Sequence, residues 1–564
     1  MSETAGGYGL IFDKDVAVPM SDGTILRANV FRPDAAGRFP VVMAMGVYGK
    51  DVHFRDAFSA QWERLRAIYP GIDSDGSTGR FLRWEMADPE RWVPDGYVVV
   101  AVDSRGSGKS PGYLDPFSPV ETRDFAEAID WAGVQDWSTG KVGLLGVSYL
   151  ASKQWQVAAL QPKHLAAIVP WEGANDFYRE YGRHGGIRTR FPVDWWPRQV
   201  LLNQHGIADT RYRDADTGER TTGPALAPAM LGGNRSNHID ELLNHTLDDE
   251  WYRAMTPDPG RITVPLLSAA NWGGPGLHLR GNIEGFLAAA SLRKWLSFHI
   301  GTHFESFYLP AYVAMQKRFF ERYLKDIDNG WEDQPPVRLE VRTVDGSHVR
   351  AEREWPLART QWTPWYLDAA NRDPAGALTA AANEAEGAVS YAALGDGVDF
   401  STAPFETGTE ITGPVAARLY VSSSTADMDV FATLRLFDLA GDEVSFVGAH
   451  EDTPVTRGWL RASHRKIDPE RSLPYRPWHS HDEIQKLQPD EIVALDVEIW
   501  PTSIVVPPGY RLVLTLAGRD FEYDTPGRML HDDPADRPAA EFGGVNTIYT
   551  GGARASFLLL PHIP

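Results

Sequence analysis

The chain has 564 residues, of which 43% are hydrophobic and 23% charged, with no cysteine and a formal net charge of −21 at pH 7. This length exceeds what one hydrophobic core usually serves, so we expect two or three domains of a globular protein. The negative charge would repel a nucleic-acid backbone or an anionic membrane surface, which argues against both as partners. The lack of cysteine excludes disulfides, thiolate nucleophiles and cysteine-based metal sites.

The first residues carry no sign of export or membrane insertion. They contain neither the basic region nor the apolar run of a signal peptide, and no later window approaches the 18 or so apolar residues of a membrane span. We therefore expect a cytoplasmic protein. Residues 14–33 then alternate between apolar and polar around Ser21-Asp22-Gly23, which predicts a β-hairpin.

The first half of the chain alternates between predicted strands and helices. Apolar runs predict buried strands over 39–45, 97–102, 142–145, 165–169, 264–270 and 295–300, and amphipathic spacing predicts helices over 121–133 and 311–323. This alternation is typical of a parallel sheet with helices on both faces, which binds ligands beyond the carboxyl ends of its strands. The alternation breaks between residues 176 and 260, where helical segments predict a cap over that edge.

The second half has a different pattern. From Val337 onward, short alternating strands are separated by Gly, Pro, Asp and Asn, which predicts a β-sandwich or jelly roll. The boundary falls near residues 330–336. Residues 369–392, rich in Ala, Gly and Glu, are expected to form a loose loop.

Ser148 stands at the corner between a predicted strand and a predicted helix within residues 141–161. A serine on such a turn is raised above the sheet as a nucleophile elbow, and the backbone N–H of Tyr149 then points at a developing oxyanion. Gly146 fits the usual pattern, but Leu150 stands where a second glycine belongs, and the small residue, Ala151, comes one later. Taken alone, the triplet also fits an ordinary turn serine.

Six separated segments, taken together, resemble the CocE/NonD hydrolases, the family of cocaine esterase, α-amino-acid ester hydrolases and Xaa-Pro dipeptidyl peptidases. They are VPMSDGTILRANVFRP (18–33), the predicted strand that leads into Val47-Tyr48-Gly49, VDSRGSGKSPG (102–112), DWSTGKVGLLGVSYLA (136–151), GTHFESFY (301–308) and TEITGPVAARLYVSSSTADMDVFATL (409–434). The resemblance implies an α/β-hydrolase domain over 1–172 and 261–332, a helical cap over 173–260, and a jelly-roll domain of the galactose-binding type over 333–564.

The resemblance also implies roles for individual residues. Ser148 would be the nucleophile that forms an acyl-enzyme, and His303, after the last sheet strand, the general base. The Tyr48 phenol would complete the oxyanion hole beside the Tyr149 N–H. His299 lies four residues before His303, but inside a predicted strand, where the two side chains do not converge as they would on a helix. We expect neither a metal nor a cofactor.

The triad acid is where the chain departs from its relatives. The family places an Asp in a Trp-x-Asp context after the strand that precedes the histidine, and here Gly274 occupies that position. Three carboxylates are candidate replacements: Glu172 after an earlier strand, Glu284 and Glu305. Glu172 is favoured because it falls on the correct edge of the sheet. A Ser–His dyad or a loss of activity remains the fourth alternative.

The residues therefore predict a serine hydrolase that acts on a small-molecule ester or amide without a cofactor. Two other functions stay open at this point. One is a catalytically impaired protein that binds a carbohydrate or another small ligand, motivated by Gly274. The other is an acyltransferase that uses an acceptor other than water. The sequence leaves open whether the chain forms a homodimer.

Overall fold

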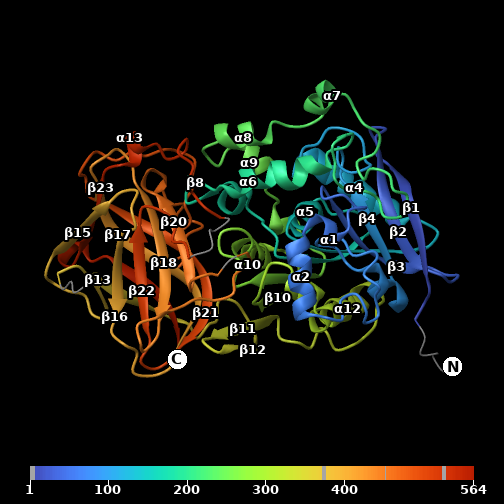
Figure 1. The fold of residues 1–564 in the computed structure, drawn as a ribbon. Helices are drawn as coiled ribbons and strands as arrows, with labels where there is room; N and C mark the ends of the chain where they lie inside the picture. Colours follow the sequence, from blue (N-terminus) through green and yellow to red (C-terminus); the bar gives the residue numbers. More distant parts are fainter. Residues whose placement is uncertain (1–6, 371–375, 451, 524–528) are drawn as a thin grey trace.

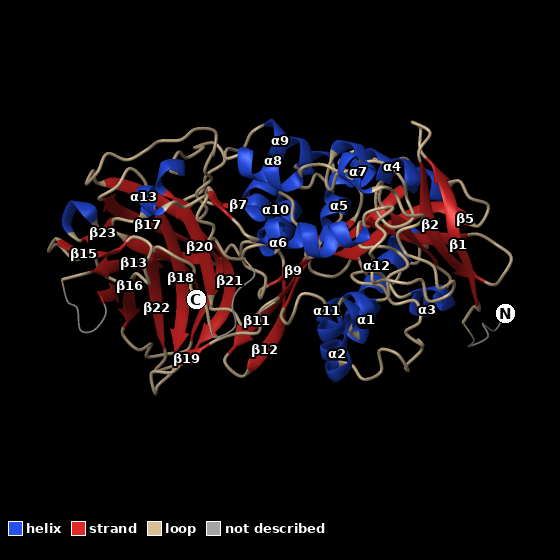
Figure 2. Cartoon of the chain, turned by 45° about the horizontal axis from the view of Figure 1, so that its top comes forward, coloured by secondary structure: helices blue, strands red, loops and turns tan. Residues whose placement is uncertain are grey.

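The computed structural model describes residues 7–370, 376–450, 452–523 and 529–564. Its N-terminal half forms a sheet flanked by helices, its C-terminal half is built mainly of strands, and the two halves lie side by side (Figures 1 and 2). The part of the chain that the structure describes contains no helix long and apolar enough to cross a membrane.

The N-terminal sheet has the spatial order β1-β2-β4-β3-β5-β6-β9-β10. β1 and β2 form the predicted hairpin, β2 pairs antiparallel with β4, and every later pairing in this order is parallel. The strands span Leu10–Pro19, Ile25–Pro33, Phe39–Gly46 (β3), Val98–Asp103 (β4), Ser138–Val147 (β5), Leu165–Trp171 (β6), Leu266–Asn271 (β9) and Lys294–His299 (β10). The parallel strands therefore end at one common edge.

Helices cover both faces of this sheet, because alternate side chains of each strand point in opposite directions. In β3, Val42 belongs to the same buried cluster as Phe320 of α12, whereas Val41 belongs to the cluster that contains Phe125 of α4. The larger helices of this half are α2 (Ser59–Ile68), α4 (Pro119–Gly133), α5 (Tyr149–Ala158), α10 (Leu279–Ala288) and α12 (Pro310–Leu324). The predicted sheet with two covered faces is confirmed.

Two long connections rise from the common strand edge. The first, between β3 and β4, carries α2 and the short helices α1 (Phe54–Ala57) and α3 (Pro89–Trp92). The second, between β6 and β9, contains a two-stranded ribbon and a series of short helices, as the sequence indicates for a cap. These elements are β7 (Arg183–His184), β8 (Ile187–Arg188), α6 (Phe191–Trp195), α7 (Pro228–Gly233), α8 (His238–Asn244) and α9 (Glu250–Met255).

The C-terminal half contains strands β11 to β24, and β11 joins the two halves because it pairs in parallel with β10. The long strand β17 pairs antiparallel with β21, β23 and β24. A jelly-roll order for these strands stays a prediction. Their bounds are Val337–Thr343 (β11), Gly346–Glu352, Gln361–Asp368, Gly376–Thr379 (β14), Gly387–Ala392 (β15), Val398–Thr402, Thr409–Ser423 (β17), Asp429–Phe437, Glu443–Val444, Thr456–Arg461, Val493–Val506 (β21), Arg511–Ala517, Val545–Thr550 (β23) and Phe557–Ile563 (β24).

The loose loop expected over 369–392 is wrong for two parts of that stretch, since the strands β14 (Gly376–Thr379) and β15 (Gly387–Ala392) lie there. Residues 371–375 of that stretch lie outside the described residues. β14 pairs with β13 (Gln361–Asp368) and β16 (Val398–Thr402), and β15 pairs with β23. Pairing with strands distant in sequence thus outweighs the weak strand preference of an Ala- and Gly-rich segment.

Gly173, just beyond β6, lets the end of that strand pack directly on helix α5. A Cβ at this position would lie 2.7 Å from Ala151 Cβ and 2.9 Å from the Ser152 amide nitrogen, both of α5. We expect Gly173→Ala to lower the thermal unfolding midpoint, with a destabilisation of ~1–3 kcal/mol, because the backbone of α5 would have to shift to relieve the steric overlap. Differential scanning calorimetry measures this.

Gly232→Ala is the matched control. Gly232 lies on the exposed helix α7, and a Cβ there would meet no heavy atom within 4 Å. This change should leave the midpoint unchanged or raise it slightly, since Ala is the better helix former. Equal midpoints for the two variants would contradict the packing described.

Candidate active site

Ser148 sits on a strained turn between β5 and α5, with φ 60° and ψ −117°. A positive φ is costly for a residue other than glycine and is concentrated at functional sites. The missing second glycine of the elbow is compensated elsewhere in space. A Cβ at Gly46 would lie 2.4 Å from Leu150 Cδ2, and one at Gly146 would lie 2.6 Å from Leu150 Cβ. Leu150 therefore fills the room that these two glycines leave.

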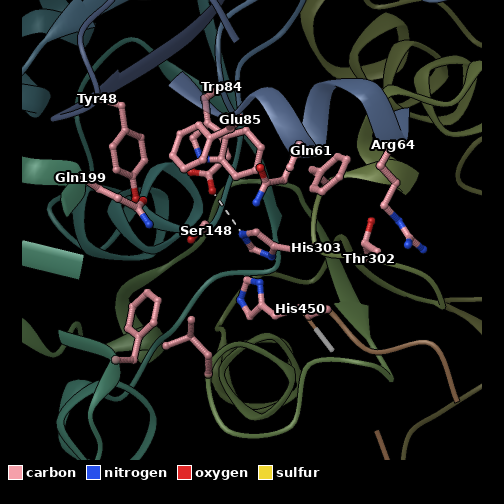
Figure 3. A pocket seen from close by; sticks show the side chains of 16 residues that line it. Tyr48, Gln61, Arg64, Trp84, Glu85, Ser148, Gln199, Thr302, His303 and His450 are labelled. Carbon is pink, nitrogen blue, oxygen red and sulfur yellow. Dashed lines mark hydrogen bonds and ion pairs between the residues drawn. The ribbon is translucent and has the colours of Figure 1, made fainter. Parts of the chain in front are cut away.

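Tyr48 lines the same cavity as Ser148, two residues beyond the end of β3 (Figure 3). Its hydroxyl oxygen accepts a hydrogen bond from Trp195 Nε1 at 3.1 Å, which leaves its own O–H available to another acceptor. Burial and the nearby Glu85 carboxylate raise the pKa of Tyr48 well above its usual value, so the phenol stays protonated. The Tyr149 hydroxyl instead donates to Glu121 Oε1 at 2.5 Å.

The imidazole that touches Ser148 is one that the sequence analysis did not single out. Ser148 Oγ lies 3.0 Å from His278 Nε2, and no direct hydrogen bond joins Ser148 to His303 within the described ranges. The His303 ring stacks on the His278 ring, with centroids 5.2 Å apart and an interplanar angle of 18°. Ser148 thus faces one member of a stacked imidazole pair.

Glu172 is the candidate acid that the structure brings to His303. It follows the last residue of β6 with φ 52°, its side chain is fully buried, and its Oε2 lies 2.8 Å from His303 Nδ1. Its Oε1 accepts from Asn271 Nδ2 at 3.1 Å and lies 2.9 Å from His299 Nε2. Burial opposes ionisation, but the His303 charge and these hydrogen bonds lower the pKa of Glu172 below its usual value.

The position of Gly274 explains how a carboxylate from another strand reaches His303. A Cβ at Gly274 would lie 4.0 Å from Glu172 Oε2. The Glu172 carboxylate therefore occupies the space beside the position from which the family's Asp would project. It arrives there from the end of β6 instead of the end of β9, and these two strands are neighbours in the sheet.

The other two candidate acids are engaged elsewhere. Both oxygens of Glu284 accept hydrogen bonds from Arg476 Nη1, at 2.8 and 2.6 Å. Glu305 Oε1 accepts from Arg64 Nε at 2.5 Å, and its Oε2 accepts from the Thr302 amide at 3.2 Å. Neither makes a hydrogen bond to His303 in the part of the chain that the structure describes.

The cavity over Ser148 has a volume of about 170 Å³ and receives residues from both halves of the chain. Ala449 and His450, of the C-terminal half, lie in its wall, and the Ala449 carbonyl accepts the His303 amide at 3.0 Å. The remaining lining is largely aromatic and polar: Tyr48, Phe58, Ala60, Gln61, Arg64, Trp84, Glu85, Phe191, Gln199, Leu277, Thr302, His303 and Phe304. Figure 3 shows Glu85 and His303 joined by a contact at its centre.

Two residues of the site, His278 and Glu85, escaped the sequence analysis. His278 follows the Asn271–Gly276 turn in which the chain departs from its relatives, so no motif marks it. Glu85 lies in the irregular connection between β3 and β4, where periodicity gives no signal. Among the described residues, no group of three or more His, Asp or Glu side chains is arranged to hold a metal ion.

The comparisons with known proteins identify the family to which this chain belongs. The family model for X-Pro dipeptidyl-peptidase (S15 family) matches residues 22–305, and that for the X-Pro dipeptidyl-peptidase C-terminal non-catalytic domain matches residues 329–559. Cocaine esterase from a Rhodococcus strain is 27% identical over 99% of both chains. A CocE/NonD family hydrolase from Staphylococcus aureus has a structure that matches with a TM-score of 0.85 and 34% identity, covering 100% of this chain and 97% of that one. This chain therefore belongs to the CocE/NonD family of serine hydrolases.

Proposed function

We propose that this protein cleaves an ester or amide bond of a small molecule through an acyl-enzyme on Ser148. The observation that carries the proposal is the buried 2.8 Å contact between Glu172 and Nδ1 of His303, which lines the same cavity as Ser148. A carboxylate on Nδ1 fixes the tautomer whose Nε2 can accept a proton. His278 lacks such a partner, because its Nδ1 is buried without a hydrogen bond among the described residues. We therefore assign the general base to His303.

In this scheme the Ser148 hydroxyl turns from His278 to His303 when substrate binds. The stacking of the two rings supports the exchange, since it keeps the two imidazoles side by side. His303 Nε2 takes the proton from Ser148 Oγ as Oγ bonds to the substrate's carbonyl carbon, and the carbonyl electron pair moves onto oxygen. The Tyr48 O–H and the Tyr149 N–H donate to that oxyanion.

The second half of the reaction uses the same groups in reverse. Collapse of the tetrahedral intermediate expels the alcohol or amine, which takes the proton from His303. Water then attacks the acyl carbon while His303 takes its proton, the bond to Ser148 Oγ breaks as Oγ receives that proton, and the carboxylic acid leaves. An amine or alcohol in place of water would turn the enzyme into an acyltransferase, which product analysis with added acceptors distinguishes.

The cavity supports substrates with an apolar or aromatic group next to the carbonyl. Phe58, Trp84, Phe191 and Phe304 provide apolar walls. Among the described lining residues, Glu85 is the carboxylate, and it contacts His303. The cap residue Glu180 is bound to Arg280. We therefore favour substrates without a free α-amine. In this scheme the C-terminal half, as a jelly roll, closes one wall of the cavity.

The identity of the nucleophile is tested by labelling with a fluorophosphonate probe. We expect the wild-type protein to be labelled and Ser148→Ala to show no labelling, because the probe reacts with an activated serine hydroxyl. Ser390→Ala, on strand β15 of the C-terminal half, serves as the control and should label like the wild type. A folded wild-type protein that resists the probe would instead favour the catalytically impaired binding protein.

The acid is tested by comparing three carboxamide variants in the turnover of p-nitrophenyl esters. Glu172→Gln should lower kcat by about 10³–10⁴, because His303 loses the carboxylate that fixes its tautomer. Glu284→Gln and Glu305→Gln, whose carboxylates pair with Arg476 and Arg64, should lower it far less. Circular dichroism checks the fold of each variant. Full activity in Glu172→Gln would refute the assignment.

The oxyanion hole is tested by Tyr48→Phe, which removes one donor and keeps the ring. We expect kcat to fall by about 10²–10³ with little change in KM, because the hydrogen bond forms mainly in the transition state. Tyr181→Phe is the matched control, since the Tyr181 hydroxyl pairs with His238 Nε2 in the cap and does not line the cavity. Equal losses in the two variants would argue against a role for Tyr48 in the reaction.

A further inference from the structure

Glu85 is held against the nucleophile elbow by its own backbone. Its carbonyl accepts the amide of Val147, the residue before Ser148, at 3.1 Å. Gly146 permits this approach, since a Cβ there would lie 3.3 Å from the Glu85 carbonyl oxygen. Glu85 itself has φ 65°, a backbone conformation that residues other than glycine rarely adopt. A strained residue fixed in a cavity wall indicates a function for its side chain.

The side chain of Glu85 is buried and points at the proposed base. Its Oε1 lies 3.2 Å from His303 Nε2, the nitrogen that must receive the Ser148 proton (Figure 3). Its Oε2 is buried without a hydrogen-bond partner among the described residues. His303 is thus held between two carboxylates, Glu172 at Nδ1 and Glu85 at Nε2, while Ser148 pairs with His278.

The groups around this pair determine its protonation. Besides the two carboxylates, His303 is faced by the rings of His278 and His450, and Glu85 is faced by the phenols of Tyr48 and Tyr308. Burial raises the pKa of Glu85 to about 7, although His303 opposes the shift. Burial disfavours the charged form of His303, but Glu172 and Glu85 together raise its pKa to about 10.

We propose that Glu85 is a positioning residue that competes with Ser148 for His303 Nε2 and so sets the pH above which His303 can act as the base. This inference rests on the proposed function. The competing contact keeps a proton on Nε2, which must leave before the Ser148 proton can be taken. The carboxylate favours the imidazolium, so the fraction of neutral His303 grows only as the pH rises toward the pKa of the pair.

The test is the pH dependence of fluorophosphonate labelling, whose second-order rate constant reports ionisations of the free enzyme. Glu85→Gln removes the charge, lowers the pKa of His303 and should shift the acidic limb of the profile down by about one to three pH units. At a pH on that limb, the variant should therefore label at least about tenfold faster than the wild type. A structural role for Glu85 would slow labelling without moving the limb.

Two matched variants frame the result. Glu85→Asp keeps the charge and should leave the limb closer to that of the wild type, and Glu305→Gln, a carboxylate paired with Arg64 that makes no contact with His303, should not move it. An unmoved limb in a folded Glu85→Gln protein overturns the role of Glu85. Absence of labelling in the wild type would instead overturn the proposed function.

Should Glu85→Gln fail to fold, the wild-type protein supplies the answer. Histidine labelled with ¹⁵N allows the titration of His303 to be followed by NMR, with His303→Gln identifying its signal. We expect the ring to stay protonated through pH 8. Titration near 6.5, the ordinary value for histidine, would refute the proposal.

Discussion

The buried contact between Glu172 and His303 is the constraint on which the site depends. Both residues project from the edge where the parallel strands end, and both are almost inaccessible to solvent, so neither charge is relieved by water. A buried carboxylate is stable only when its hydrogen-bonding capacity is filled, and here His303, His299 and Asn271 fill it. Glu172 directly follows β6, Asn271 ends β9, and His299 ends β10. The contacts of the Glu172 carboxylate therefore fix the relative positions of these three strands.

The proposed assignment of the acid to Glu172 illustrates how a parallel sheet tolerates a change in the position of a catalytic residue. Neighbouring strands of a sheet lie about 4.8 Å apart, so a longer side chain on β6 can bring its carboxylate close to the place that a shorter one on β9 would serve. The Glu172 carboxylate lies beside Gly274 in this way. The loss of the family's Asp therefore need not remove the carboxylate from the site.

Much of the fold could be predicted from the sequence because it rests on local patterns. A few consecutive residues are enough to recognise the apolar runs of the parallel strands, the turn at Ser21–Gly23 and the corner at Ser148. Glu172 could be favoured as the acid because its place after a strand fixes the edge on which it lies. His278 and Glu85 could not be found in this way, since their importance comes from burial and from contacts with residues far away in the sequence. The strands β14 and β15 were hidden for the same reason, as they exist through pairing with distant partners.

The wall of the cavity formed by Ala449 and His450 links the two halves of the chain in one further respect. The Ala449 amide donates to the Gly273 carbonyl at 2.6 Å, and the Ala449 carbonyl accepts from the His303 amide. The second half therefore helps to hold both the turn after β9 and the loop after β10 that carries His303. An exchange of this half between related enzymes would alter both the shape of the cavity and the position of the His303 imidazole. Substrate selectivity in related enzymes should therefore evolve by changes in both halves together. Chimaeras that combine halves of two enzymes are expected to need compensating substitutions where the halves meet.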